Sequence, residues 1–311
     1  MTALEVRHLH KRYGRHVAVD DVSFSVDEGE IFGIIGPNGA GKTTTVESIA
    51  GLRRPDSGSV SVLGLDPVAD RAEVRRRLGV QLQESSFPDA ITVGEALDLY
   101  ASFYPDPADR RELVELLDLG DQRDTRYKAL SGGQKQRLSI ALALVGNPRV
   151  AILDELTTGL DPQARRDTWS VVERVRDRGV TILLVTHFMD EAERLGDRIA
   201  VISGGRVAAV DTPAGLVARV DAPQQVRFRL RQPLDASVLT GLPDVTGVDV
   251  VDDRWRVTGR GQVLSSVAGA LARAQVVAED LRVDRRNLDD AFVALTGRTP
   301  GSVDASERKA G

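Results

Sequence analysis

The first 220 residues alternate between short apolar runs and segments with helix signals. Residues 30–35, 150–153 and 181–185 are apolar almost throughout, which is typical of strands buried on both faces of a parallel sheet. Residues 4–6 and 22–26 alternate between apolar and polar side chains, as strands with one buried face do. This order predicts an α/β fold in which functional groups gather at the carboxyl ends of the parallel strands.

Helix signals lie between the strands. Residues 42–50 predict a helix that Gly51 ends, because glycine readily adopts the left-handed backbone found after a helix. Between residues 83 and 130, Thr92 and Glu95 form a capping box ahead of apolar residues with a helical period. That interval is therefore expected to be mainly helical.

The pattern changes character after about Arg219. In order along the chain it predicts strands at 226–230 and 255–257, a helix at 263–274, a strand at 276–283 and a last helix capped by Asn287. We expect a small α+β domain over residues 222–297. The polar tail at residues 298–311 is expected to be disordered.

A phosphate-binding motif follows the first buried strand. Residues 36–43 read Gly-Pro-Asn-Gly-Ala-Gly-Lys-Thr and fit the P-loop pattern G-x-x-x-x-G-K-[ST]. The glycines let successive N–H groups turn around a phosphate, Lys42 adds a positive charge and Thr43 offers a hydroxyl to Mg²⁺. The preceding strand and following helix place the phosphate at a helix N-terminus. A glycine-rich turn with a chance lysine would not require this context.

A second motif, Leu-Ser-Gly-Gly-Gln, occupies residues 130–134. Ser131 and Gln134 form a capping box, and Gly132 and Gly133 leave the backbone amides uncovered. This too is a helix N-terminus suited to an anion. Alone, it would more often be a capped helix without a ligand.

Charged and polar side chains end the two other apolar strands. Asp154 and Glu155 follow residues 150–153, and His187 follows residues 181–185. Asp154 can hold Mg²⁺ through water, and Glu155 can take a proton from an attacking water. Taken singly, the two acids would be a helix-capping pair and His187 a surface residue, but after a P-loop they point to phosphate chemistry.

Together, these motifs resemble those of the ATP-binding subunits of ATP-binding-cassette (ABC) transporters, over roughly residues 2–215. The resemblance identifies residues 36–43 as the Walker A loop and residues 130–134 as the signature motif. It identifies Asp154 and Glu155 as the end of the Walker B strand, residues 159–161 as the D-loop and His187 as the switch histidine. Leu156 stands where the family usually has proline, and leucine does not fix the backbone as proline does.

The resemblance also implies the residues of the site. Catalysis is expected from Glu155, His187 and Lys42, and Mg²⁺ binding from Thr43, Gln83 and Asp154. Tyr13 is expected to stack on adenine, and Gln83 to sense a membrane partner. The residues expected to bind ATP are Tyr13, Gly36, Pro37, Asn38, Gly39, Ala40, Gly41, Lys42, Thr43, Thr44, Gln83, Ser131, Gly132, Gly133, Gln134 and Asp161.

A fold and an assembly follow from the same resemblance. It implies a P-loop ABC ATPase cassette at residues 2–219, with a mixed sheet core, an antiparallel β subdomain and a helical subdomain at about 84–145. Two cassettes, either two copies or a copy and a related chain, are expected to face head to tail. An integral membrane permease would hold them at the cytoplasmic side of the cell membrane.

Composition narrows the classes further. The net charge of −5 argues against general nucleic-acid binding, and the chain has no cysteine for disulfides or thiol chemistry. The sequence has neither an apolar run long enough to span a membrane nor an N-terminal signal pattern. These features predict a protein that reaches the membrane only through a partner.

Two other classes stay open at this level. A soluble ABC protein of DNA repair would carry a long coiled coil between Walker A and signature motif, and one of translation usually carries two cassettes. A regulatory subunit without turnover would not need Glu155 or His187. The C-terminal stretch at residues 287–297 resembles drug-export subunits, which favours export of a drug, antibiotic or other hydrophobic compound.

Overall fold

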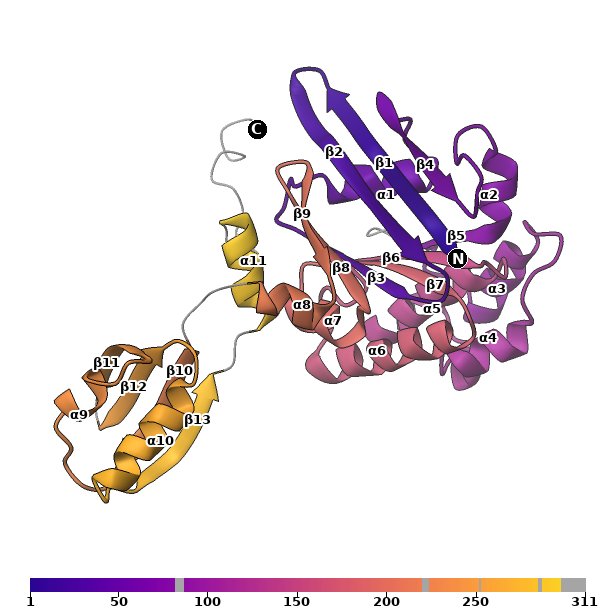
Figure 1. Ribbon diagram of the computed structural model, residues 1–311. Coiled ribbons are helices and arrows are strands. Elements are labelled where there is room, and N and C mark those ends of the chain that lie inside the picture. The colour runs from indigo at the N-terminus through magenta and orange to yellow at the C-terminus, as the bar shows by residue number, and fades with distance from the viewer. Residues whose placement is uncertain (82–86, 220–223, 252, 285–286, 298–311) are drawn as a thin grey trace. The chain divides into compact units, whose positions relative to one another are not determined.

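The computed structural model describes residues 1–81, 87–219, 224–251, 253–284 and 287–297. The chain forms two compact units (Figure 1). The larger unit comprises residues 1–216 and the chain from Phe292 onward, and the smaller comprises residues 217–291. All motifs between residues 36 and 187 therefore belong to the larger unit. Gln83 and the tail at 298–311 lie outside the described residues.

A mixed sheet organises the larger unit. Among the described residues it has nine strands in the order β4-β1-β2-β9-β8-β3-β7-β6-β5. β8, β3, β7, β6 and β5 run parallel, whereas β4, β1 and β2 form an antiparallel arm. The bounds are β1 Thr2–Tyr13, β2 His16–Asp27, β3 Ile31–Ile35, β4 Ser57–Val62, β5 Leu78–Gln81, β6 Val150–Asp154, β7 Thr181–Val185, β8 Arg198–Ser203 and β9 Arg206–Asp211. The mixed sheet and antiparallel subdomain expected from the sequence are confirmed.

The central strands are buried on both faces. Every residue of β3, β6 and β7 is buried, as their unbroken apolar runs predict. Alternate residues of β6 join different cores: Ala151 and Leu153 pack into one hydrophobic cluster, and Val150 and Ile152 into another. Because side chains fill both faces, only the strand ends remain available for chemistry.

Helices cover the sheet, and α3, α4, α5 and α6 begin at side-chain caps. The structure has α1 Lys42–Ile49, α2 Arg71–Arg77, α3 Val93–Ala101, α4 Arg110–Leu116, α5 Gly132–Leu144, α6 Pro162–Asp177, α7 Met189–Leu195 and α8 Pro213–Ala218, with 3₁₀ turns at Gly120–Gln122 and Tyr127–Ala129. Both predicted capping boxes, at Thr92 and at Ser131, are present. Gly51 follows α1 with φ 66°, the left-handed conformation expected of it.

The smaller unit is an α+β sandwich of two layers. Its described residues form a four-stranded antiparallel sheet with the order β11-β12-β10-β13, and α9 and α10 complete a β-α-β-β-α-β chain order. The bounds are β10 Gln224–Leu230, α9 Ser237–Thr240, β11 Val245–Val251, β12 Arg254–Gly259, α10 Val263–Arg273 and β13 Ala278–Asp284. A separate core of Val226, Phe228, Trp255, Val257 and residues of α10 holds it together.

The last helix, α11 (Leu288–Thr296), starts in the smaller unit and ends in the larger one. The Asn287 side chain accepts a hydrogen bond from the Asp290 N–H at 3.0 Å, which confirms the predicted cap. Gly297 follows the helix with φ 67°.

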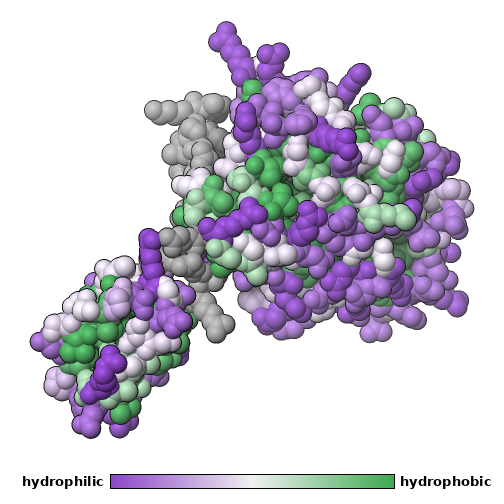
Figure 2. Space-filling view, viewed as in Figure 1, coloured by the Kyte–Doolittle hydropathy of each residue, from purple (hydrophilic) through white to green (hydrophobic). Residues whose placement is uncertain are grey.

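The surface is largely polar along the helices of the larger unit. In the view of Figure 2, hydrophilic side chains cover the region of α4 and α6, and apolar side chains gather in a band above them. None of the helices in the described part of the chain is long and apolar enough to cross a membrane.

Candidate functional site

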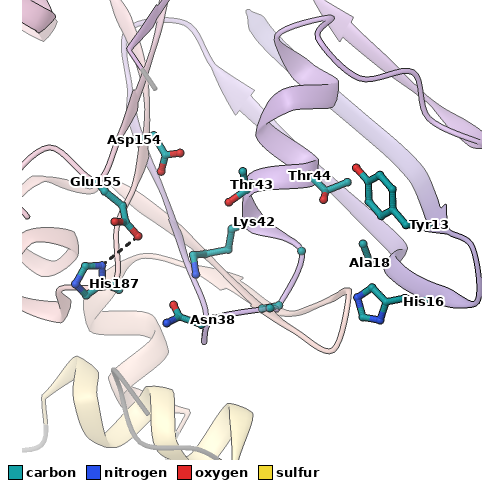
Figure 3. Close-up of a pocket in the computed structure, with 13 residues that line it drawn as sticks. Tyr13, His16, Ala18, Asn38, Lys42, Thr43, Thr44, Asp154, Glu155 and His187 are labelled. Atoms are coloured by element: carbon teal, nitrogen blue, oxygen red, sulfur yellow. Dashed lines mark hydrogen bonds and ion pairs between the residues drawn. The ribbon is translucent and has the colours of Figure 1, made fainter. Parts of the chain in front are cut away.

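A pocket of about 580 Å³ opens at the carboxyl ends of the parallel strands (Figure 3). The loop after β3, the ends of β6 and β7, and the β1–β2 arm all contribute to its lining. The predicted site residues that line it are Tyr13, Asn38, Gly39, Ala40, Gly41, Lys42, Thr43, Thr44, Asp154, Glu155 and His187. Four segments far apart in the sequence thus meet where the strand order places them.

The loop between β3 and α1 is shaped by glycines with special backbone angles. Gly41 is the N-cap of α1 with φ 97°, and Gly39 has φ 74°. A Cβ on Gly41 would come within 2.3 Å of the Ala18 carbonyl oxygen, and one on Gly36 within 2.3 Å of the Ile202 carbonyl oxygen. Only glycine fits at either position, and the N-terminus of α1 is left facing the pocket.

Lys42 is held inside this loop. Its ammonium group donates hydrogen bonds to the carbonyl oxygens of Gly36 at 2.8 Å and Pro37 at 3.1 Å, and its side chain is buried. Burial lowers the pKa of Lys42 below its usual value, while the nearby carboxylates of Glu155 and Asp154 act in the opposite direction. The pocket therefore presents one fixed positive charge beside two acids.

Asp154 is a buried carboxyl at the end of β6. Burial raises its pKa to about 6, the charge of Glu155 adds to this effect, and Lys42 opposes it. The backbone N–H of Asp154 donates to the Gln81 side-chain oxygen at 3.1 Å. A carboxyl at this place in the pocket can supply an oxygen ligand to a cation that arrives with a ligand.

Glu155 and His187 lie side by side at the ends of β6 and β7 (Figure 3). The His187 Nδ1 is 3.3 Å from a Glu155 carboxylate oxygen. Glu155 has φ 51°, a conformation that non-glycine residues rarely adopt, and its N–H donates to the Val185 carbonyl at 2.8 Å. This bond ties the Glu155 backbone to the neighbouring strand β7, and the Glu155 side chain lines the pocket.

The opposite wall belongs to the β1–β2 arm. Tyr13 is 38% exposed, and the Arg53 guanidinium lies 5.3 Å from its ring centre. His16 and Ala18 also line this wall (Figure 3). Neither was among the residues expected from the sequence, since no local motif marks them. An exposed aromatic ring at this end of the pocket can stack on a flat ligand group.

The second motif does not join this pocket. The described lining residues include none of Ser131, Gly132, Gly133, Gln134 and Asp161. Ser131 caps α5, and Asp161 caps α6 by accepting hydrogen bonds from Gln163 and Ala164 at 2.9 and 3.0 Å. These hydrogen bonds hold the pKa of Asp161 below its usual value. Gly36 and Pro37 are also absent from the described lining, although their carbonyl oxygens accept hydrogen bonds from Lys42.

One wall of the pocket thus offers phosphate-binding groups and a cation site, and the other an aromatic ring. The acid–histidine pair at the strand ends can activate a water, because a carboxylate within reach of a bound phosphate can accept a proton. The capped helix N-terminus at Ser131 does not contribute to the described lining of this pocket.

Comparison with known proteins agrees with these features. The family model described as ABC transporter matches residues 19–158. The chain is 37% identical to the daunorubicin resistance ATP-binding protein DrrA3 of Streptomyces coeruleorubidus over 305 residues, which cover 95% of this chain and 96% of that protein. It is 44% identical to the Nod factor export ATP-binding protein I of Burkholderia orbicola (strain AU 1054) over 220 residues, which cover 69% and 72% of the two chains.

Solved structures give the same likeness. A structure described as the ATP-binding subunit of an ABC transporter superposes with a TM-score of 0.62 and 31% identity, covering 70% of this chain and 92% of that one. The cbiO1 protein of Clostridium perfringens, part of the ABC transporter complex cbiONQ, gives a TM-score of 0.64 with 27% identity over 70% and 91% of the two chains.

Proposed function

We propose a specific role on the premise that this chain belongs to the ABC transporter family, of which it is an ATP-binding and ATP-hydrolysing subunit. In this role it powers export across the cytoplasmic membrane. The observation that carries the proposal is the pocket itself: Lys42, Asp154 and the Glu155–His187 pair face one cavity, and the residues at 131–134 are absent from its described lining.

The pocket residues have different roles in ATP binding and hydrolysis. The backbone N–H groups of residues 38–44 and the Lys42 ammonium bind the phosphates of ATP, and Tyr13 stacks on adenine. Glu155 accepts a proton from the attacking water, and His187, 3.3 Å away, orients that carboxylate and the terminal phosphate. The left-handed backbone at Glu155 keeps its carboxylate aimed at the cavity.

Mg²⁺ fits the donors that this site provides. The Thr43 hydroxyl and the Asp154 carboxylate are hard oxygen ligands on one wall of the pocket, and Gln83 is the third proposed ligand. No cluster of three or more His, Cys, Asp or Glu suited to a metal occurs among the described residues. A cation that takes most of its ligands from phosphate and water needs no such cluster. When bound, Mg²⁺ would neutralise phosphate charge beside Asp154.

A second cassette would complete the site. Ser131 to Gln134 form a capped helix N-terminus without a ligand in their own pocket, so we propose that they meet the ATP of the opposing subunit. Asp161, which caps α6 next to the Glu155 loop, would lie at the same interface. ATP binding would then close the dimer, and hydrolysis would release it.

We further propose that a permease with membrane-spanning helices holds the dimer at the cytoplasmic face of the membrane, with Gln83 and residues 84–145 forming the contact. Relatives named for daunorubicin resistance and for Nod factor export support export as the direction of transport. The transported compound would be a drug, an antibiotic or another hydrophobic molecule.

The test separates binding from hydrolysis. Glu155→Gln keeps the shape of the side chain but loses the base, so hydrolysis should fall by about 10²–10⁴ while ATP binding persists. On size-exclusion chromatography with ATP and Mg²⁺, this variant should elute as a dimer. Lys42→Ala should lose both binding and dimer formation. Wild-type hydrolysis by Glu155→Gln would remove Glu155 from the mechanism.

A further inference from the structure

The sheet of the smaller unit has one covered face and one exposed face. Val226 and Phe228 of β10, with Trp255 and Val257 of β12, are buried in the core against α10. The neighbouring side chains alternate to the other face, and on β10 and β12 they include four exposed arginines. Arg227, Arg229, Arg254 and Arg256 therefore stand on one surface.

The strand register brings these arginines directly opposite one another. Arg227 of β10 pairs with Arg256 of β12 on one side and with Arg282 of β13 on the other. In the next row, Arg229 pairs with Arg254. Side chains opposite each other in antiparallel strands lie about 5 Å apart at Cβ, and like charges there destabilise a sheet. The smaller unit thus keeps an arrangement that costs it stability.

Four of the five arginines have no carboxylate partner among the described residues. Among the residues that the structure describes, Arg229, Arg254, Arg256 and Arg282 form no ion pair. Arg227 donates a hydrogen bond to the neutral Gln225 side chain at 3.3 Å. Glu279, which pairs with Arg229 in the register, forms its ion pair with Arg231 instead. Four guanidinium groups therefore keep their donors available to an external anion.

The surface is hollowed rather than flat. The five arginines line a cavity of about 950 Å³ on this sheet. The lining also contains four acids: Asp249 on the edge strand β11, which lies opposite Arg256 in the register, Asp253 just before β12, and Glu279 and Asp280 on the edge strand β13. The positive charge is thus concentrated along the two central strands, β10 and β12, between acidic margins.

We propose that this arginine face, formed by Arg227, Arg229, Arg254, Arg256 and Arg282, binds an acidic, extended peptide segment of a partner protein. Arginines two residues apart on one strand are spaced by about 6.6 Å, the same interval as alternate carboxylates of an extended peptide. Each guanidinium can take a carboxylate through two parallel hydrogen bonds. The acidic segment would replace the repulsion between facing arginines by ion pairs. This site is independent of the nucleotide pocket.

Two other polyanions fit the face less well. A membrane surface is a wide anionic plane, which Asp249 and Glu279 at the margins would repel. Single-stranded RNA is usually read on such sheets by stacking on aromatic rings, but Phe228 and Trp255 are buried in the core beneath the arginines. A narrow acidic chain along β10 and β12 would avoid the acids at the margins and would need no exposed aromatic ring.

The experiment uses the full-length chain and a fluorescein-labelled peptide of alternating glutamate and serine, with a glutamine version as its control. Fluorescence anisotropy at low and high salt measures binding. The test variant is Arg229→Gln with Arg254→Gln, which removes one facing pair. The matched control is Arg273→Gln, an exposed arginine on α10, on the other layer of the same unit. Far-ultraviolet circular dichroism and thermal unfolding of each variant check that the smaller unit is folded, because ATP hydrolysis reports only on the larger unit.

The glutamate peptide should bind the wild type and Arg273→Gln equally, and the double variant about tenfold more weakly or worse. The glutamine peptide should not bind, and salt should weaken the complex. Equal binding by the double variant, or no binding to the wild type, overturns the proposal. Phosphatidylglycerol vesicles and single-stranded RNA are assayed in parallel. Arginine-dependent binding to either of these without peptide binding would also overturn it.

Discussion

At the scale of single residues, Glu155 shows how the backbone prepares the chemistry. Its φ of 51° is disfavoured for a residue with a Cβ. The resulting backbone strain lies directly after the end of β6. The hydrogen bond from its N–H to Val185 and the packing of fully buried Leu156 hold the strained turn in place. Leu156 therefore anchors by burial the position where the family usually has proline.

The pocket contains two histidines with different surroundings, which allows a matched comparison. His187 lies 3.3 Å from Glu155, whereas His16 lines the wall next to Tyr13 (Figure 3). His187→Ala should lower turnover by about a hundredfold with little change in ATP affinity. His16→Ala should leave turnover at saturating ATP unchanged. Steady-state hydrolysis and equilibrium binding of a fluorescent ATP analogue would measure the two effects.

A reversed outcome would be informative. If His187→Ala lost nucleotide binding while retaining turnover at high ATP, the histidine would support the structure of the pocket instead of the reaction. Thermal unfolding of both variants without nucleotide would identify a loss of folding.

At the scale of elements, one buried carboxylate joins three segments around the site. Glu191 on α7 is fully buried and accepts hydrogen bonds from the Thr157 hydroxyl at 2.9 Å and the Trp169 indole at 3.0 Å. Thr157 belongs to the loop between Glu155 and α6, and α7 starts directly after Phe188. Glu191 thus fixes the loop that carries the glutamate relative to the segment that carries the histidine.

We expect Glu191→Ala to unfold more easily by about 2–4 kcal/mol, because two buried donors lose their acceptor. Turnover should fall as the loop loses its anchor, while ATP affinity changes less. Glu191→Gln keeps an acceptor oxygen and should retain most of both properties. Urea unfolding and hydrolysis assays on the pair would test this. Equal losses of stability and turnover in both variants would mean that the carboxylate charge of Glu191, and not its hydrogen bonds, anchors the loop.

The burial of Glu191 also predicts that the stability of the folded chain depends on pH. Burial raises the pKa of Glu191 above its ordinary value, so the folded chain takes up this proton more readily than the unfolded chain. Its contribution to stability is present at low pH and is lost as the pH rises through the raised pKa. Relative to Glu191→Gln, the wild type should therefore gain stability between pH 7.5 and pH 5. If the free energies of unfolding of the wild type and of Glu191→Gln changed in parallel with pH, a raised pKa of Glu191 would be contradicted.

Local patterns predicted the elements better than the contacts between them. The capping boxes at Thr92 and Ser131 and the cap at Asn287 were readable because their partners lie three residues away. The phosphate loop and the strand-end acids were readable for a similar reason. Thr157 and Glu191 are 34 residues apart in sequence, and Ala18 matters through its carbonyl oxygen next to Gly41, so neither contact leaves a local pattern.

At the scale of the whole molecule, the end of the chain returns to the unit where it began. The sequence predicted separate domains at 2–219 and 222–297, and these boundaries stay predictions. The compact units divide α11 instead, with Phe292 onward belonging to the larger unit. Phe292 is fully buried, so cutting the chain near Arg219 would remove an apolar side chain from the larger unit. Truncation alone is therefore a harsh test of whether the smaller unit matters for ATP binding.

A deletion that retains α11 separates the loss of the smaller unit from the loss of the Phe292 packing. We expect a variant in which a flexible glycine–serine linker replaces residues 220–287, so that α11 is retained, to bind and hydrolyse ATP like the full chain. Every described residue that lines the nucleotide pocket lies outside the deleted stretch. A chain that stops at Arg219 should bind ATP but unfold at lower temperature, because the packing of Phe292 is lost. Isothermal titration with ATP and thermal unfolding of the three chains give the comparison.

The function of the smaller unit can then be measured in the linker variant together with the membrane partner. If that unit serves assembly or transport, drug resistance in cells should fall while hydrolysis by the isolated subunit persists. Arg229→Gln with Arg254→Gln in the full chain should reproduce the loss if the arginine face carries the contact, since that variant keeps the whole unit folded. Loss of ATP binding by a folded linker variant would instead make residues 220–287 part of the catalytic unit. In that case the two compact units of the chain would be a single functional domain.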